Sequence, residues 1–283
     1  MKVLIGIATQ NRASILPRAI ESALGQDYSN KEVAIFDDGS NDETSDLRRM
    51  FPQVSWYRSD VPVGIAAART HLMRTADTDL YFSLDDDAWF MKGDEISIAV
   101  KLMTQQRNLA AVAFDILSAD RPALNKRVEP HHCHSFIGCG HMLRLSAAKE
   151  VNYYTPNPGF YGSEEKDLSL RLLNQGYEIL YLPGVHVWHD KTPQARNISA
   201  QHISGVCNDL VFAYRRCPLP MALWLIPGKA LNHLRFSIRR RRVVACLKGF
   251  LLFSKSIPVI AQTREPVSRK SFRKFLQLSR ASR

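Results

Sequence analysis

The chain has 283 residues, of which 45% are hydrophobic and 23% are charged. This composition excludes a chain that is disordered over most of its length, and it provides enough apolar side chains for a sizeable core. The net charge of +11 is uneven, because residues 207–283 hold 17 Lys and Arg against 2 Asp and Glu, while residues 1–206 hold 21 against 25. An acidic front part could hold a cation, and the basic tail could bind a polyanionic surface.

The cysteines and the apolar segments indicate the compartment. Five cysteines, an odd number without a framework spacing, indicate free thiols in a reducing environment. The apolar run at residues 2–8 is too short for a signal-peptide core and lacks a cleavage site. No run of about 18 uncharged apolar residues occurs, so we expect no helix that clearly spans a membrane. These features predict a cytoplasmic protein.

The first 90 or so residues alternate between predicted strands and helices. The strands are expected at residues 3–8, 32–36, 54–57 and 80–84, and the helices at residues 16–24 (capped by Ser14), 42–50 and 64–76. This alternation is typical of a parallel sheet covered by helices. Polar clusters follow three of the strands, at residues 9–12, 37–40 and 85–87. Because open α/β sheets bind ligands at the carboxyl ends of their strands, the pattern predicts a nucleotide or phosphate site there.

The rest of the chain contains weaker signals and then changes character. We expect helices at residues 95–106 and within 161–174, and strands at residues 110–114, 136–145 and 179–182. From about Ser199 the sequence becomes helical, basic and apolar, with interruptions at several prolines. It therefore divides into an α/β domain at residues 1–198 and a basic, amphipathic helical region at residues 199–283.

Asp85, Asp86 and Asp87 follow an apolar run directly. Three adjacent carboxylates repel one another unless they are solvated or neutralised. Mg²⁺ typically binds one or two protein carboxylates together with water and substrate phosphates. A solvated acidic turn is the alternative, but the position at the end of a buried strand, beside two other polar strand ends, favours a metal site.

Asp37-Asp38-Gly39-Ser40 has three interpretations. It could be a strand-to-helix turn in which Gly39 supplies an unusual backbone angle. It could also present a carboxylate that accepts a hydrogen bond from a nucleobase N–H. The Asp-x-Asp nucleophile of haloacid dehalogenase-like phosphatases is excluded, because its third position is occupied by Gly39.

Five motifs in order and at the right spacing resemble family 2 of the glycosyltransferases, which have the GT-A fold. They are Thr9-x-Asn11-Arg12, Asp37-Asp38-Gly39-Ser40, Gly64 with Arg69, Asp85-x-Asp87, and Glu164-Glu165-x-Asp167-Leu168-x-x-Arg171. The resemblance covers about residues 2–192 and identifies residues 1–198 as a GT-A catalytic domain, with a mixed, mostly parallel sheet flanked by helices. It implies inverting transfer of a sugar from a nucleoside-diphosphate donor of the UDP or dTDP type.

The resemblance also assigns donor-binding roles. The corresponding residues are Thr9, Asn11, Arg12, Asp38, Arg69, Asp85 and Asp86. Thr9 would face the nucleoside, Arg12 would lie near the diphosphate, and Asp38 would accept the imide N–H of uracil or thymine. Arg69 would help to close the nucleotide pocket, and Asp85 or Asp86 would lie near the ribose or the sugar.

The same resemblance implies a metal site and a general base. Asp87 would bind Mg²⁺ or Mn²⁺, with Asp85 and His189 as further ligands. Glu165 would be the base, with Glu164 as the competing assignment, although the family usually has Glu-Asp at this pair. A base that takes the proton of the acceptor hydroxyl in a single displacement inverts the anomeric centre.

Two further groups of residues have assignments that depend on the histidine-rich segment and on the acceptor side of the site. The run His131-His132-Cys133-His134 with Cys139 and His141 suggests zinc, but its spacing does not match the common zinc motifs. The resemblance instead makes Gly138 and Gly140 part of a Gly-rich strand start near the acceptor, with Trp188 as a pocket wall. Asp167 and Arg171, at i and i+4, are expected to form a structural or surface ion pair.

The basic tail predicts contact with an anionic membrane. Arg239-Arg240-Arg241-Arg242 precedes an apolar segment, and Trp224 lies in another. Such helices suit a membrane surface, at about 1 kcal/mol per contacting Lys or Arg. Lys248 and Lys255 argue against spanning. A helical subdomain packed on the catalytic domain is the alternative, and nucleic acid is not expected because no RNA-binding motif accompanies the charge.

These features together predict a peripheral enzyme on the inner face of the plasma membrane. Its acceptor would be a glycan or a lipid-linked glycan, in cell-surface polysaccharide or lipopolysaccharide synthesis. The alternative is a non-catalytic, membrane-associated protein that binds nucleotide sugars, suggested by Glu165 in place of the usual Asp. A sugar-1-phosphate nucleotidyltransferase is excluded, because residues 5–9 lack the required Gly-rich phosphate loop. The sequence does not predict an oligomeric state.

Overall fold

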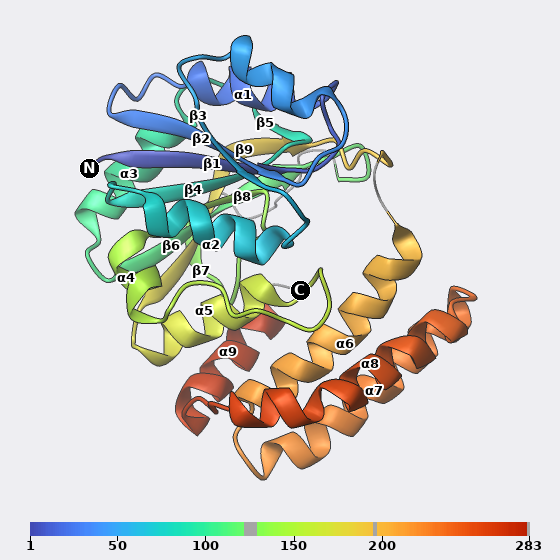
Figure 1. Ribbon diagram of the computed structural model, residues 1–283. Coiled ribbons are helices and arrows are strands. Elements are labelled where there is room, and N and C mark those ends of the chain that lie inside the picture. The colour runs from blue at the N-terminus through green and yellow to red at the C-terminus, as the bar shows by residue number, and fades with distance from the viewer. Residues whose placement is uncertain (122–128, 195–196, 282–283) are drawn as a thin grey trace.

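The computed structural model describes residues 1–121, 129–194 and 197–281. Within these residues a nine-stranded sheet is flanked by helices, and a group of long helices packs beside it (Figure 1). The strand order is β3-β2-β1-β4-β8-β6-β9-β5, with β7 paired to β9. The predicted mixed α/β architecture is confirmed.

The first half of the sheet is parallel, as the alternation of strands and helices predicts. Its elements are β1 (Val3–Thr9), α1 (Leu16–Leu24), β2 (Lys31–Asp38), the 3₁₀ helix η1 (Glu43–Arg49), β3 (Ser55–Ser59), α2 (Ile65–Thr75) and β4 (Leu80–Asp85). All of β1 is buried, which explains its unbroken apolar run. Two local expectations were wrong: residues 43–49 form a 3₁₀ rather than an α-helix, and the N-cap of α1 is Ile15 rather than Ser14.

The second half of the sheet contains both parallel and antiparallel pairs of strands, and its strand β8 lies antiparallel to β4. Its elements are β5 (Ala88–Phe90), α3 (Glu95–Gln105), β6 (Leu109–Leu117), β7 (His131–His132), β8 (Gly140–Arg144), α4 (Leu145–Glu150), α5 (Glu164–Asn174) and β9 (Glu178–His189). The strand predicted at residues 179–182 is only the first part of β9. Its last residue, His189, pairs with Ala88 of β5, just after the aspartate run.

The C-terminal region is helical, as predicted. It comprises α6 (Ile198–Arg216), α7 (Met221–Arg239), α8 (Val243–Gln262) and α9 (Arg269–Ala281). Phe212, Phe272 and Phe275 of this region share an apolar cluster with Leu168 of α5, so the region packs onto the α/β part. The division at residues 198 and 199 remains a prediction.

Buried ion pairs also join the two regions. Asp167 of α5 accepts hydrogen bonds from Arg171 at 2.7 Å and from Arg216 of α6 at 2.6 Å. All three side chains are buried, so the predicted Asp167–Arg171 pair is structural rather than superficial. Burying charges without partners is costly, and this arrangement satisfies the charges across the junction.

Helix α8 differs from the expectation that no helix could span a membrane. Among the described residues it alone is long and apolar enough to do so. Its most apolar stretch of 18 residues has a mean hydropathy of 1.8, and 28% of that stretch is buried. One face packs closely on α6, since a Cβ on Gly249 would lie 2.7 Å from the Cβ of Val206. Length and composition alone carry little weight, because helices of soluble cores share them.

Candidate active site

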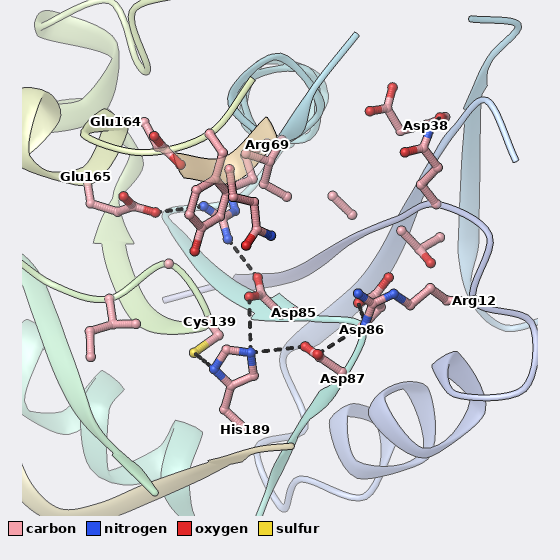
Figure 2. A pocket seen from close by; sticks show the side chains of 18 residues that line it. Arg12, Asp38, Arg69, Asp85, Asp86, Asp87, Cys139, Glu164, Glu165 and His189 are labelled. Carbon is pink, nitrogen blue, oxygen red and sulfur yellow. Dashed lines mark hydrogen bonds and ion pairs between the residues drawn. The ribbon is translucent and has the colours of Figure 1, made fainter. Parts of the chain in front are cut away.

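A cavity of about 270 Å³ lies at the carboxyl ends of β1, β2 and β4. Its walls also include residues of α2, α5, α6 and β9. Eleven of the predicted site residues line it: Thr9, Arg12, Asp38, Arg69, Asp85, Asp86, Asp87, Gly138, Glu164, Glu165 and His189. Residues far apart in the sequence therefore meet at the predicted edge of the sheet (Figure 2).

Asp38, at the end of β2, shapes the loop before α2. Its two carboxylate oxygens accept hydrogen bonds from the backbone N–H groups of Val63 at 2.6 Å and Gly64 at 2.9 Å. Gly64 adopts a φ of 88°, which favours glycine. The neighbouring Asp37 accepts from the Ser40 N–H at 3.0 Å and does not line the cavity. Of the two aspartates, Asp38 is therefore the one available to a ligand.

Arg12 pairs with two members of the aspartate run. Its Nη1 lies 3.3 Å from Asp86 Oδ1 and 3.1 Å from Asp87 Oδ2, and all three side chains are nearly buried. Burial raises the pKa of Asp86 to about 7, opposed by Arg12 and reinforced by Asp87. Asp86 is therefore partly protonated near neutral pH, which lowers the repulsion within the run.

Arg69, on α2, bridges the aspartate run and the glutamate pair. Its Nη2 donates to Asp85 Oδ1 at 2.7 Å and its Nη1 to Glu165 Oε1 at 3.0 Å. Its pKa is raised well above the usual value, since Asp85, Tyr154 and Glu165 outweigh the opposing effect of burial. Gly138 lies against this bridge, because a Cβ there would be only 2.5 Å from Glu165 Oε1.

His189 connects the two outer aspartates of the run. Its Nε2 lies 3.1 Å from Asp87 Oδ1 and 4.0 Å from Asp85 Oδ2, and its Nδ1 lies 3.4 Å from Cys139 Sγ. One ligand atom each from Asp85, Cys139 and His189 lie within 4.8 Å of one another, so this cluster could hold a cation. Asp85 supplies one carboxylate and His189 an imidazole, and Asp87 adds a second carboxylate 3.1 Å from His189. Such oxygen and nitrogen donors suit Mn²⁺ or Mg²⁺, whereas the Cys139 thiol is a softer donor.

The glutamate pair opens α5. Glu164 is buried, and the Glu165 side chain is 18% exposed. Burial, followed by the charge of Glu165, raises the pKa of Glu164 to about 8. Glu164 is therefore mainly protonated at neutral pH, whereas Glu165 is the carboxylate that Arg69 holds.

Three predicted site residues lie outside the cavity wall. Asn11 is held in the loop after β1, where its Oδ1 accepts from the Asn41 N–H at 2.7 Å. Gly140 faces the core, where a Cβ would lie 2.3 Å from Ile116 Cδ1. Trp188 stacks on Trp89, with ring centroids 6.1 Å apart. The donor contact of Asn11 and the acceptor contacts of Gly140 and Trp188 have no support in this geometry.

The histidine-rich segment does not converge on one site. Among the described residues, the group of potential metal ligands takes only Cys139 from it. His141 is buried, with Nδ1 2.9 Å from the Ile137 carbonyl and Nε2 3.0 Å from the Tyr154 hydroxyl. His186 lies 3.5 Å from Asp115 and not in the cavity wall. Of the two histidines of β9, His189 is therefore the one that lines the cavity.

Seven further residues line the cavity, and four of them were hardly indicated by the sequence although they carry polar or sulfur atoms. Gln10, Cys139, Tyr161 and Gln201 also line the cavity. Gln10 follows Thr9, and Cys139 lies between two singled-out glycines, so proximity in sequence was the only signal for these two. Gln201 belongs to α6, and only the packing of the helical region brings it to the site.

The chain is similar in sequence to known bacterial proteins. Curated relatives include the putative colanic acid biosynthesis glycosyl transferase WcaA of Escherichia coli, 32% identical over 90 residues, which are 30% of this chain and 32% of that protein. The succinoglycan biosynthesis protein ExoU of Rhizobium meliloti is 33% identical over 95 residues, 32% of this chain and 28% of that protein. The chain thus matches about a third or less of these relatives' length.

Solved structures share the fold. Staphylococcus aureus TarS 1-349 in complex with UDP-GlcNAc aligns with a TM-score of 0.67 and 12% identity, covering 94% of this chain and 82% of that one. The mannosyltransferase PcManGT of Pyrobaculum calidifontis, in complex with GDP-Man and Mn²⁺, gives 0.62 and 14%, covering 99% and 80%. The predicted GT-A fold is confirmed.

The sequence profile described as glycosyl transferase family 2 matches residues 4–152, which is more than half of the chain. That segment contains Asp38, Arg69 and the aspartate run. The chain belongs to glycosyl transferase family 2.

Proposed function

We propose that this chain is an inverting, metal-dependent glycosyltransferase that uses a nucleoside-diphosphate sugar of the UDP or dTDP type. The observation that carries the proposal is the charge of the cavity. Six acidic side chains and two arginines line it, and the arginines are already paired with carboxylates. Even with Glu164 mainly protonated and Asp86 partly so, the remaining acidic groups outnumber the arginines. Such an excess of carboxylates suits a divalent cation, and the cation in turn suits a diphosphate.

Residues at one end of the cavity are suited to the nucleoside. Asp38 lies at this end, away from the glutamate pair (Figure 2). Both of its oxygens already accept backbone hydrogen bonds, which fix the carboxylate in place and leave lone pairs for the imide N–H of a base. Thr9, at the end of β1, is the second residue that we assign to the nucleoside.

The middle of the cavity is suited to the cation and the diphosphate. Asp87, Asp85 and His189 would hold Mn²⁺ or Mg²⁺, and their oxygen and nitrogen donors fit either ion. When bound, the ion supplies positive charge that stabilises the departing diphosphate. Arg12 adds a guanidinium beside Asp86 and Asp87 that can serve the same charge. PcManGT, whose structure contains Mn²⁺, supports this assignment.

Glu165 is suited to act as the general base. The acceptor hydroxyl must lose a proton as it attacks the anomeric carbon, and a carboxylate on the opposite wall can take it. The raised pKa of Glu164 disfavours that residue as the base near neutral pH. Arg69 orients Glu165 through the 3.0 Å hydrogen bond. A single displacement with one such base inverts the anomeric centre.

The test compares two substitutions in the glutamate pair. A thermal-shift panel of nucleotide sugars, with and without Mn²⁺, first identifies the donor. Glu165→Gln should then lower the rate of nucleotide release in transfer by about 10²- to 10⁴-fold while the donor still binds. Glu164→Gln, which resembles the protonated form, should have a much smaller effect. Normal turnover in Glu165→Gln would refute the assignment of the base.

We further propose that the enzyme acts at an anionic membrane surface on the cytoplasmic side, on a glycan or lipid-linked acceptor. Apolar side chains of α7 and α8 are exposed: Leu223, Trp224, Leu231, Phe236, Ile238, Val244, Leu247, Leu251, Ile257 and Val259. Arg215 and Arg216 are buried, so fewer than the 17 basic residues of the tail can contact lipid. The names of WcaA and ExoU, which refer to polysaccharide biosynthesis, support this class of acceptor.

A further inference from the structure

A second cavity, of about 560 Å³, lies between the start of α6 and the turn that joins α7 to α8. We call it the hairpin groove. It is lined by Ile198 and Ser199 of α6, by residues 241–245 and by Lys248. None of these residues contributes to the catalytic cavity, so the hairpin groove requires an explanation of its own.

The hairpin groove is strongly positive. Arg241, Arg242 and Lys248 line it, and no acidic residue does. None of these three cations forms an ion pair with an acidic residue in the described part of the chain. Elsewhere in the same region two less exposed cations have acidic partners: Arg216 pairs with Asp167 at 2.6 Å and Lys229 with Asp209 at 2.8 Å. The uncompensated charge of the groove therefore favours an anionic ligand.

Two features of the backbone add to this preference. Arg241 adopts a φ of 54°, at a helix end where glycine is the usual residue. Helix α8 begins in the groove with no side-chain cap and no acidic residue in its first turn. Its positive dipole end thus adds to the field of the three cations, and phosphate is an anion that guanidinium groups can bind through two parallel hydrogen bonds.

The walls of the hairpin groove indicate what is attached to that phosphate. Ile198 and Val244, which line it, are 58% and 68% exposed. Leu247 and Leu251 continue the apolar surface along α8, each 54% exposed. Large exposed apolar surfaces mark binding sites, and an apolar wall makes no favourable contact with a free phosphate ion. An anionic head with an apolar chain satisfies both surfaces.

The hairpin groove and the catalytic cavity share the first turn of α6. Ile198 and Ser199 line the groove, and Gln201 lines the catalytic cavity. Residues three positions apart in an α-helix are separated by about 4.5 Å along its axis. A lipid phosphate in the groove would therefore present an attached sugar at the mouth of the cavity that contains Glu165.

We propose that the hairpin groove binds the phosphate group of a lipid phosphate-linked acceptor, for which polyprenyl phosphate serves as the probe, with the lipid chain against the exposed face of α8. This inference rests on the proposed function, because it names the acceptor of that reaction. It differs from general attraction to a membrane, since it assigns the phosphate to Arg241 and Arg242 rather than to the whole basic surface.

The run of four arginines supplies a matched control. Arg241→Gln/Arg242→Gln removes two charges inside the groove, and Arg239→Gln/Arg240→Gln removes two that do not line it. Binding of the full chain is measured by flotation with phosphatidylcholine vesicles that contain either polyprenyl monophosphate or phosphatidylglycerol at equal surface charge. The preference for polyprenyl phosphate should fall by about tenfold or more in the groove variant and stay unchanged in the control.

Three outcomes would overturn the proposal. The unmodified chain could bind both kinds of vesicle equally, or both double variants could lose the same preference, and either result would leave only general electrostatic attraction. Competition by inorganic phosphate as strong as that of polyprenyl phosphate would indicate a free-phosphate site. Thermal shift with the donor nucleotide and Mn²⁺ tests the catalytic cavity separately, so failure of the groove proposal leaves the proposed function intact.

Discussion

Gly138→Ala is the substitution that tests the geometry of the cavity most sharply. The new Cβ would lie 2.5 Å from Glu165 Oε1 and 2.7 Å from Arg69 Nη2. Contacts under 3.0 Å are essentially never seen for a Cβ, so Glu165 must move by at least about 0.5 Å and Arg69 by about 0.3 Å. Arg69 has less freedom to move, because its side chain is 4% exposed and is also held by Asp85 at 2.7 Å.

The size of the effect follows from this displacement. A misplacement of about 1 Å can cost about 10²-fold in rate, so a shift of about half that size should lower kcat by about ten- to a hundredfold. This corresponds to about 1.4–2.8 kcal/mol in the activation free energy. The backbone of Gly138 is not left-handed, so alanine should fit it, and the free energy of unfolding should change little.

Gly140→Ala is the control, because its Cβ would meet Ile116 Cδ1 at 2.3 Å in the core and not the Arg69–Glu165 bridge. Overpacking there should cost about 1–3 kcal/mol of stability. Nucleotide release is measured for both variants, together with thermal unfolding and the KM for the donor. We expect Gly138→Ala to lose kcat at unchanged Tm, and Gly140→Ala to lose Tm at nearly unchanged kcat.

The opposite pattern would refute this reasoning. If Gly138→Ala kept the parental kcat while Glu165→Gln abolished turnover, the position of the base would not depend on the contact with Gly138. If both glycine variants lost kcat equally at temperatures well below their Tm, Gly140 would contribute to the site after all.

Two further predictions concern the metal and the interface between the regions. Chelation should abolish turnover and Mn²⁺ should restore it, and His189→Ala should raise the Mn²⁺ concentration for half-maximal rate about tenfold or more; turnover that persists in chelator would contradict the metal site. Asp209→Ala should cost about 2–3 kcal/mol of stability in denaturant unfolding, because Lys166, Lys229 and His233 lose their shared partner. These partners outweigh burial and lower the pKa of Asp209 below its usual 3.8. The contribution of Asp209 to the free energy of unfolding is therefore complete above about pH 5 and is lost as the pH falls below about 4. Asp209→Asn should therefore flatten the acid limb of the stability profile, and an unchanged limb would contradict the prediction.

The sequence by itself determined the fold class and most of the candidate site. Buried parallel strands have unbroken apolar runs, so β1, β2 and β4 can be predicted from the sequence alone. The carboxyl ends of parallel strands lie at one edge of the sheet, so the positions of these ends follow as well. Asp38 and the aspartate run follow such strands directly. Their position in the fold was thus fixed by the local pattern alone.

Only the tertiary structure decided which groups touch. The approach of His189 to Asp87 depends on the pairing of β9 with β5, and the Arg69 bridge depends on a fold that brings one residue of α2 and one of α5 to the same cavity. The two glycines of one short motif separated in the same way, with Gly138 in the cavity wall and Gly140 in the core. The spacing of apolar residues along a helix or strand predicts the face on which a side chain lies. It does not predict which side chain of a distant element will contact it.

The helical region shows the same division. Its charge and apolar content were plain in the sequence, but the hairpin groove and the position of Gln201 beside the catalytic cavity were not. Both result from the packing of the helical region, in which Ile198 and Ser199 line one groove with residues 241–245 and Lys248. The composition of a segment predicts its overall charge and apolar content. A binding site, however, requires particular side chains to lie close together, and the packing of distant elements decides which side chains do so.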